Sequence, residues 1–221
     1  MNQKNKKILN KKQIIFLIIY ILSLFVPYIK SLRHHNISLW INILRYCILG
    51  ISSFIIFKDL YSDAKKSWKE KKYKNVIYII IVFIIDMIVT SLAQIPSMIF
   101  FPDYVTANSN NISEAIKIVS KPMLLLSIGI LGPITEEIIF RGILVGKLRK
   151  KISSTVCIII SSVLFMLIHI HILAIEEILY YLPFLFTGII YSITYYKTKN
   201  ITLTIILHIM NNFPAILLAV L

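Results

Sequence analysis

Long apolar stretches, separated by short polar connections, dominate the pattern of this chain from end to end. Each stretch approaches the roughly 20 residues that a helix needs to cross about 30 Å of hydrocarbon. Because lipid offers the backbone no hydrogen-bond partners, such stretches must satisfy their own peptide groups, which favours helices. We therefore predict an all-α, polytopic membrane helix bundle with about seven transmembrane helices. They are expected at residues 13–29, 38–57, 76–101, 122–146, 154–173, 177–196 and 201–221.

The composition supports a membrane protein. Hydrophobic residues make up 57% of the 221 residues and charged residues only 15%, whereas an ordinary soluble domain is about 45–50% apolar. The formal net charge of +14 raises the possibility of nucleic-acid binding, but the basic residues gather in alternate connections between the apolar stretches. Topology therefore explains the charge better than a nucleic-acid partner does.

The distribution of lysine and arginine predicts an orientation. Placing the N-terminus in the cytoplasm puts 18 of the 24 basic residues on the cytoplasmic side and four outside, as the positive-inside rule requires. We expect a multi-pass protein of the cell membrane with a cytoplasmic N-terminus. Seven of these basic residues lie in residues 58–75, which we interpret as an extended polar cytoplasmic loop.

The stretch GPITEEIIFRGIL, residues 132–144, places three charges in an apolar segment. Glu137 and Arg141 are four residues apart, so on a helix they share a face and can form an ion pair. Glu136 points about 100° away and is left free to face a polar cavity. Pro133 cannot donate a backbone hydrogen bond, so we expect the helix to break or restart just before the glutamates.

Two later segments carry the remaining polar residues that a hydrolytic site needs. His169 lies near the extracytoplasmic end of the fifth apolar segment, and His208 and Asn212 are four residues apart on one face of the last. A single histidine in such a segment is more often structural than catalytic. Polar groups on three helices of the same half of the chain are harder to explain as independent packing features.

Other ionisable residues have simpler interpretations. Arg45 and Asp86 stand alone in the second and third segments, where each can pair with another helix or reach the interface. Glu176 and Glu177 begin the sixth segment. Carboxylates are favourable at a helix N-terminus, so we expect them to cap that helix.

In chain order, Glu136-Glu137-x-x-x-Arg141, Phe165-x-x-x-His169 and His208-x-x-x-Asn212 resemble the three motifs of the CAAX-protease and bacteriocin-processing (CPBP, or Abi) family of intramembrane proteases. The resemblance covers roughly residues 118–221, which we take as a catalytic transmembrane domain. Residues 1–117 form an N-terminal part with three helices and the basic loop, and carry no matching motif.

The resemblance implies a role for each residue. Glu136 and His169 would hold and deprotonate a water molecule, while His208 and Asn212 would donate hydrogen bonds to the oxyanion. Glu137 and Arg141 would support the site, and Phe165 would shape the pocket. The implied substrate is a membrane-associated peptide or protein precursor, of the CAAX type or the bacteriocin or signal-peptide type.

Two questions stay open at this point. Glu136, His169 and His208 can be combined into a three-ligand zinc site with one open position, so the cofactor is either none or Zn²⁺. The absence of an HExxH motif separates the chain from site-2-type proteases. Of the two mechanisms, we favour a glutamate-activated water. The alternatives to a protease are a membrane immunity or regulatory member of the same family without catalysis, and a transporter.

Overall fold

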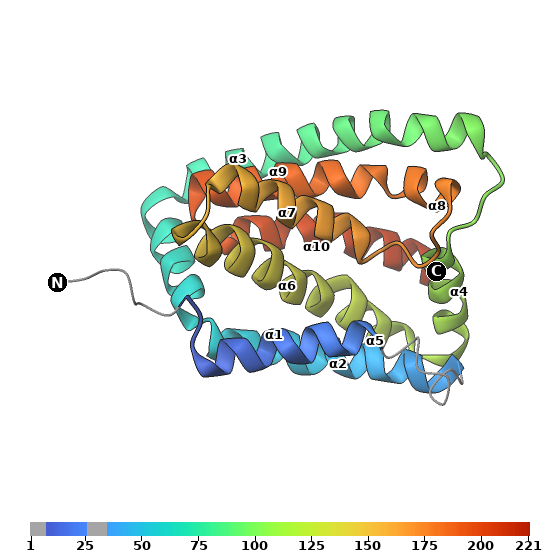
Figure 1. Cartoon of the computed structure of the whole chain (residues 1–221), viewed down its shortest axis with the longest axis horizontal. Helices are drawn as coiled ribbons and strands as arrows, with labels where there is room; N and C mark the ends of the chain where they lie inside the picture. Colours follow the sequence, from blue (N-terminus) through green and yellow to red (C-terminus); the bar gives the residue numbers. More distant parts are fainter. Residues whose placement is uncertain (1–7, 26–34) are drawn as a thin grey trace.

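The computed structural model describes residues 8–25 and 35–221, and every regular element among them is helical (Figure 1). The prediction of an all-α membrane helix bundle is confirmed. The elements are α1 (Lys11–Leu24), α2 (His35–Ile56), α3 (Lys58–Phe100), α4 (Ala107–Ile118), α5 (Lys121–Leu126), η4 (Ser127–Leu131), α6 (Gly132–Glu137), η5 (Ile138–Lys147), η6 (Leu148–Lys150), α7 (Ser154–Leu167), α8 (Ile175–Tyr180), α9 (Leu182–Thr198) and α10 (Ile201–Val220).

Five stretches in the described part of the chain are long and apolar enough to cross a membrane: 37–56, 58–100, 121–150, 175–198 and 201–220. The other two predicted spans differ. α7 is apolar but has only 14 residues, and the predicted span 13–29 continues beyond α1 outside the described residues. Among residues 8–25 and 35–221, five of the predicted spans are thus full-length candidates.

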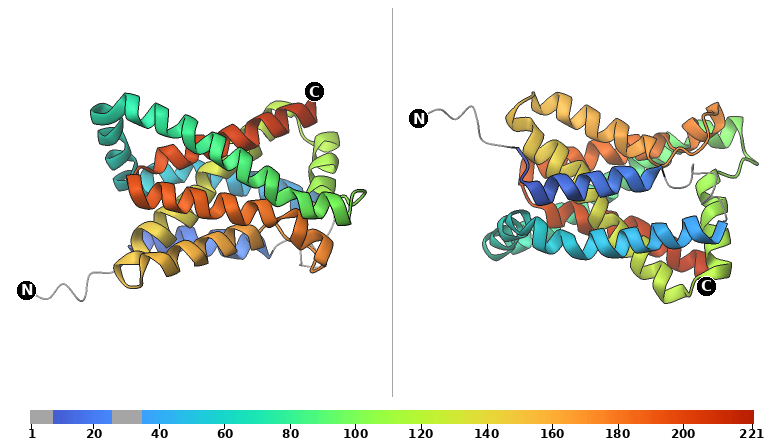
Figure 2. Two further views of the ribbon diagram at one scale, coloured as in Figure 1. Left: turned by 90° about the horizontal axis from the view of Figure 1, so that it is seen from above. Right: turned by 60° about the horizontal axis from the view of Figure 1, so that its bottom comes forward.

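The helices lie roughly side by side, with α1 and α2 along one flank and α3 and α9 along the other (Figures 1 and 2). Between them runs the stretch 121–150. In its most apolar 18-residue segment 72% is buried, against 22% in the corresponding segments of α2 and α3. The peripheral helices keep many isoleucines exposed, as lipid-facing helices do. The start of α1 and the connections before α3, before α7 and before α10 meet at one end of the bundle (Figure 1). Basic connections therefore share an end; that this end faces the cytoplasm stays a prediction.

The expected break at Pro133 is absent. Residues 121–150 are helical throughout, and the helix instead widens on both sides of α6 to the π-helical pattern in η4 and η5. The N–H of Gly132 bonds to the carbonyl of Ser127, five residues back. The change of hydrogen-bond register accommodates the backbone N–H that Pro133 lacks without interrupting the helix. π-Helical turns of this kind are frequent at functional sites.

The prediction of a polar loop at residues 58–75 is wrong. These residues form the first part of α3, in which Lys71 alone has non-helical dihedral angles and marks a kink. Lysine and glutamate are good helix formers, and Trp68 anchors this basic stretch by donating a hydrogen bond from Nε1 to Thr202 Oγ1 at 2.7 Å. A continuous helix of 43 residues would measure about 65 Å, far longer than a bilayer core. The basic stretch must therefore lie outside the hydrocarbon.

Two boundaries in the C-terminal half also differ from expectation. α7 ends at Leu167, so residues 168–174 connect it to α8 without regular structure, and the sixth predicted helix is divided into α8 and α9. α9 packs closely on α7 because Gly188 lies against Ser162, where a Cβ would come within 2.8 Å of the Ser162 Cα.

Candidate active site

The centre of the bundle holds a fully buried ion pair. Arg141 Nη1 donates to Glu137 Oε1 at 2.8 Å, and neither side chain is accessible to solvent. The four-residue spacing predicted this pair, and it persists although the helix changes from α6 to η5 between the two residues. Arg141 Nη2 also reaches the carbonyl of Gly188 on α9 at 3.5 Å. The pair thereby links the central rod to α9.

His208 joins both glutamates. Its Nδ1 lies 3.0 Å from Glu137 Oε1, and its Nε2 lies 3.8 Å from Glu136 Oε2. A carboxylate paired with arginine accepts hydrogen bonds only, so the hydrogen of His208 is on Nδ1. Glu137 therefore also orients His208, a contact that the sequence pattern did not reveal. The ring sits between two carboxylates with Nε2 towards Glu136.

Glu136 is 4% exposed and has one occupied and one open carboxylate oxygen. Tyr46 on α2 donates its hydroxyl to Oε1 at 2.9 Å, while Oε2 is buried without a hydrogen-bond partner. The guanidinium of Arg45 lies over the Tyr46 ring, 4.3 Å from its centre, which accounts for this charge within the second apolar segment. No motif marks Tyr46, because the contact depends on how α2 packs against α6.

His169 lies in the turn just after α7, not inside a helix as predicted. Its Nδ1 is 2.8 Å from the Phe165 carbonyl; a carbonyl only accepts, so Nδ1 carries the hydrogen and Nε2 is left as an acceptor. The Phe165 ring is in edge contact with the rings of His169 and His208, at centroid distances of 5.2 and 5.5 Å. The Arg141 guanidinium lies 4.4 Å from the same ring centre. Phe165 therefore touches one residue of each of the three motifs.

Asn212 follows His208 by one turn of α10. It is half-buried and makes no hydrogen bond with the described residues, so its amide is available to a ligand. Asn211 differs: its Nδ2 donates to Asp86 Oδ2 at 2.7 Å and to the Tyr191 hydroxyl at 2.8 Å.

Asp86 forms a second polar cluster beside this site. The side chain is 1% exposed and accepts hydrogen bonds from Thr187, Tyr191 and Asn211. Sequence reasoning left Asp86 as an isolated residue of the third segment, and its partners on α9 and α10 could be found only from the packing. The Tyr191 ring centre lies 6.1 Å from that of His208, so the cluster supports the wall of the site.

The prediction that Glu176 and Glu177 cap the helix they begin is wrong, because α8 has no side-chain cap hydrogen bond; Glu177 instead contacts the start of α4. Its carboxylate is fully buried and accepts from the Tyr104 hydroxyl at 2.7 Å and the backbone N–H of Ala107 at 3.4 Å. Ala107 is the first residue of α4, so Glu177 caps α4 and not α8. This contact holds the 101–106 connection against α8.

Zinc binding by Glu136, His169 and His208 stays a prediction. Across residues 8–25 and 35–221, no group of three or more His, Cys, Asp or Glu side chains is arranged to hold a metal ion. Nδ1 of His208 is occupied by Glu137, and Nδ1 of His169 by the Phe165 carbonyl. These bonds leave Nε2 of both rings open, as is usual for zinc-binding histidines. A zinc ion held by Glu136, His169 and His208 therefore stays an alternative to a glutamate-activated water.

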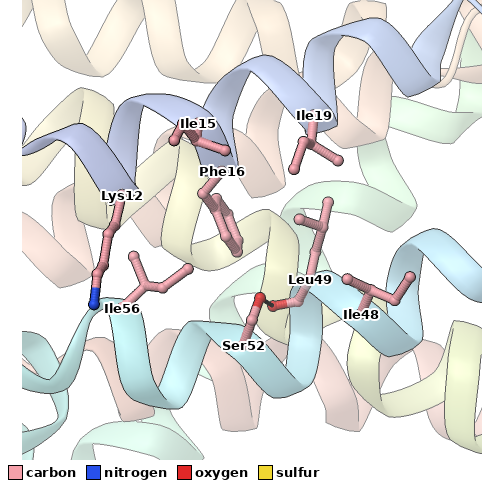
Figure 3. Close-up of a pocket in the computed structure, with 8 residues that line it drawn as sticks. All are labelled: Lys12, Ile15, Phe16, Ile19, Ile48, Leu49, Ser52 and Ile56. Carbon is pink, nitrogen blue, oxygen red and sulfur yellow. Dashed lines mark hydrogen bonds between the residues drawn. The ribbon is translucent and has the colours of Figure 1, made fainter.

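A separate cavity of about 270 Å³ lies between α1 and α2 (Figure 3). Its lining residues are Lys12, Ile15, Phe16, Ile19, Ile48, Leu49, Ser52 and Ile56. Only Lys12 and Ser52 among them carry polar side-chain groups, and none belongs to the three motifs. This apolar cavity is therefore not the place where the chemistry would occur.

Comparisons with known proteins agree with the motifs. Residues 118–214 match the family described as type II CAAX prenyl endopeptidase Rce1-like. YdiL of Bacillus subtilis (strain 168), provisionally named a membrane peptidase, is 33% identical over 105 residues, which cover 48% of this chain and 40% of that protein. The membrane-embedded CAAX protease MroQ of Staphylococcus aureus (strain USA300) is 26% identical over 217 residues, covering 88% of this chain and 83% of that protein.

No solved structure matches the chain. The family match begins at residue 118, the same position at which the motif resemblance begins, and it contains all three motifs. Both relatives are named as membrane proteins, in agreement with a multi-pass helix bundle. Residues 118–214 of this chain are thus similar to the Rce1-like type II CAAX prenyl endopeptidases.

Proposed function

We propose that the protein is an intramembrane endopeptidase in which Glu136 activates a water molecule to hydrolyse a peptide bond. The observation that carries the proposal is the buried carboxylate of Glu136, with Oε1 fixed by Tyr46 and Oε2 unpartnered beside His208. An unsatisfied buried carboxylate oxygen costs free energy. A water molecule that donates to Oε2 removes that cost and is held ready for attack.

In the proposed first step, the water oxygen attacks the peptide carbonyl carbon while its proton passes to Glu136 Oε2. Nε2 of His169, left as an acceptor by the bond from Nδ1 to Phe165, takes a hydrogen bond from the other water hydrogen. The peptide C–O π bond opens and leaves a tetrahedral oxyanion. General base catalysis of this kind contributes typically 10²–10⁴-fold.

The oxyanion is stabilised by two groups of α10. Asn212 donates from its free side-chain amide. His208, whose ring lies between Glu136 and Glu137, donates a hydrogen bond from Nδ1 to Glu137, so it donates from Nε2 to the oxyanion only when the ring is an imidazolium. Glu136 then returns its proton to the leaving nitrogen. The C–N bond breaks, and a carboxyl group and an amine are released.

The substrate is proposed to be a membrane-associated peptide or protein precursor that enters from the bilayer. The family match and the name of MroQ, a CAAX protease, support a CAAX-type substrate. Bacteriocin or signal-peptide precursors use the same chemistry and stay alternatives. The matched stretch covers less than half of YdiL, so substrate identity is a proposal for this chain alone.

The test uses the full chain in lipid nanodiscs with two probes, a farnesylated CAAX peptide and an unprenylated apolar precursor peptide, read by mass spectrometry. Glu136→Gln is compared with wild type, each with and without a zinc chelator. Glu70→Gln is the matched control, because Glu70 is exposed and pairs only with Lys66 on the surface.

We expect products from wild type and Glu70→Gln, none from Glu136→Gln, and no effect of the chelator. Loss of wild-type cleavage on chelation would replace the glutamate mechanism with a metal-dependent one. If neither the folded wild type nor the Glu70→Gln control cleaves a probe, the result would favour a partner-binding immunity or regulatory protein.

A further inference from the structure

A polar pocket opens where the basic part of α3 meets its apolar part. It has a volume of about 220 Å³ and is lined by Lys71, Lys74 and Lys197 together with polar groups of Ser67, Asn75 and Tyr78. It lies at the basic end of the bundle, where α9 ends beside the kink of α3 (Figure 1). None of these residues belongs to the candidate active site.

Tertiary contacts fix the shape of this pocket. Asn75 is 6% exposed, and its Nδ2 donates to both the carbonyl and the hydroxyl of Ser67 at 3.2 Å. These bonds bridge the kink at Lys71, because Ser67 precedes it and Asn75 follows it. Trp68 fastens the same stretch to the first turn of α10 through Thr202. Lys71 and Lys74 thus lie at a helix kink that hydrogen bonds hold in place, rather than on a free loop.

The three lysines have no anionic partner in the described part of the structure. The nearby acidic residue of the basic stretch, Glu70, pairs with Lys66 instead. Lys71, Lys74 and Lys197 make neither an ion pair nor a side-chain hydrogen bond with the described residues. Three like charges around one pocket repel each other, and a bound anion with several acceptor oxygens would relieve that repulsion.

The surface beyond the pocket indicates which anion fits. Immediately after the lysines, α3 turns apolar and exposes Ile77, Ile80, Ile81 and Ile84, each by half or more. Their spacing of three and four residues puts them on one face of the helix. Cations at the head of a lipid-facing apolar stripe match a molecule with a phosphate at one end and acyl chains at the other. A free phosphate ion would use only the pocket.

We propose that this pocket binds the phosphate group of an anionic phospholipid, whose acyl chains run along the exposed isoleucine face of α3. Basic residues near a membrane surface attract anionic lipid by roughly fivefold in affinity per residue. The three lysines together would contribute about a hundredfold. The inference is independent of the proposed proteolysis.

The test compares two triple variants of the full chain in neutral phosphatidylcholine nanodiscs. Lys71→Gln/Lys74→Gln/Lys197→Gln removes the pocket lysines. Lys65→Gln/Lys69→Gln/Lys72→Gln removes three exposed lysines of the same helix outside the pocket, so both variants carry the same net charge. Binding of titrated phosphatidylglycerol is measured by native mass spectrometry, with thermal unfolding as the check that each variant is folded.

We expect the pocket variant to lose about a hundredfold in phosphatidylglycerol affinity. When the losses are compared as logarithms of the affinity, that of the control variant should be less than a third of that of the pocket variant. Equal losses would show attraction by the general positive charge and overturn the proposal. Inorganic phosphate and glycerol 3-phosphate form a second arm. If either competes as strongly as the lipid itself, the site is one for soluble phosphate and the lipid assignment is wrong.

Discussion

Nδ1 of His208 lies 3.0 Å from Oε1 of Glu137, the same oxygen that accepts the hydrogen bond from Arg141 at 2.8 Å. One buried carboxylate therefore balances a permanent cation and orients a ring that also faces Glu136. The ion pair that stabilises the central rod and the hydrogen bond that orients His208, the proposed oxyanion donor, thus share Oε1 of Glu137. Stability and activity can be separated here only by changing both charges together.

Glu137→Gln should destabilise the protein strongly. The substitution leaves the Arg141 guanidinium fully buried without a counter-charge, and breaking a buried pair in this way costs about 3–5 kcal/mol. Thermal and denaturant unfolding in detergent measure the effect. A loss below about 1 kcal/mol would mean that another anion compensates Arg141.

The double variant Glu137→Gln/Arg141→Met should recover much of that stability, because both buried charges are removed together. Its hydrolytic activity should stay low, since the variant loses the Glu137 carboxylate that orients the His208 ring. Unfolding and peptide-cleavage assays on the same sample separate the two effects. Wild-type activity in the double variant would contradict the orienting role of Glu137.

The neighbouring residues Asn211 and Asn212 should respond in opposite ways. Asn212 has no hydrogen bond with the described residues, so Asn212→Ala should change stability by less than about 0.5 kcal/mol yet reduce kcat by roughly 10²–10³. Asn211→Ala removes a donor from buried Asp86 and should cost about 1–3 kcal/mol of stability. Steady-state kinetics and thermal unfolding of both variants check this. A stable, fully active Asn212→Ala protein would remove Asn212 from the oxyanion site.

Tyr46→Phe should lower kcat/KM by about tenfold. Hydrogen bonds to charged groups contribute about 1.5–3 kcal/mol, and part of that energy orients the Glu136 carboxylate. Tyr61→Phe is the matched control, because Tyr61 is bonded to Ser53 and stacks on Phe54 rather than on a site residue. If both variants lose activity equally, the effect comes from packing of the N-terminal helices and not from orientation of Glu136.

The contact of Tyr104 with Glu177 should be insensitive to pH over the whole physiological range. The hydrogen bond to the Glu177 carboxylate is the main reason that the pKa of Tyr104 is raised from 10.0 to about 12. A raised pKa means that the stabilisation is fully present below pH 10 and is lost as the pH rises through about 12. Ultraviolet titration of tyrosinate ionisation, compared between wild type and Tyr104→Phe, should show one hydroxyl fewer titrating near pH 12.

Periodicity and motif spacing predicted some features at the level of single residues. The Glu137–Arg141 pair follows from a spacing of four on one helix, a local relationship that survives the change to a π-helical register. The sequence pattern does not predict the helix at residues 58–75, because lysine-rich sequence suits a solvated loop and an amphipathic helix equally well. The anchoring of Trp68 on α10 favours the helix, and it depends on tertiary packing.

The sequence by itself determined the membrane bundle, the resemblance to a protease family and the identity of the motif residues, because length, hydropathy and spacing are properties of single segments. The tertiary structure alone decided which oxygen of Glu136 stays open, that Tyr46 fixes the other, and that Asp86 finds its partners on α9 and α10. These contacts join residues that are 90 to 125 positions apart. Such distances in sequence leave no periodic trace, since they depend on how whole helices pack.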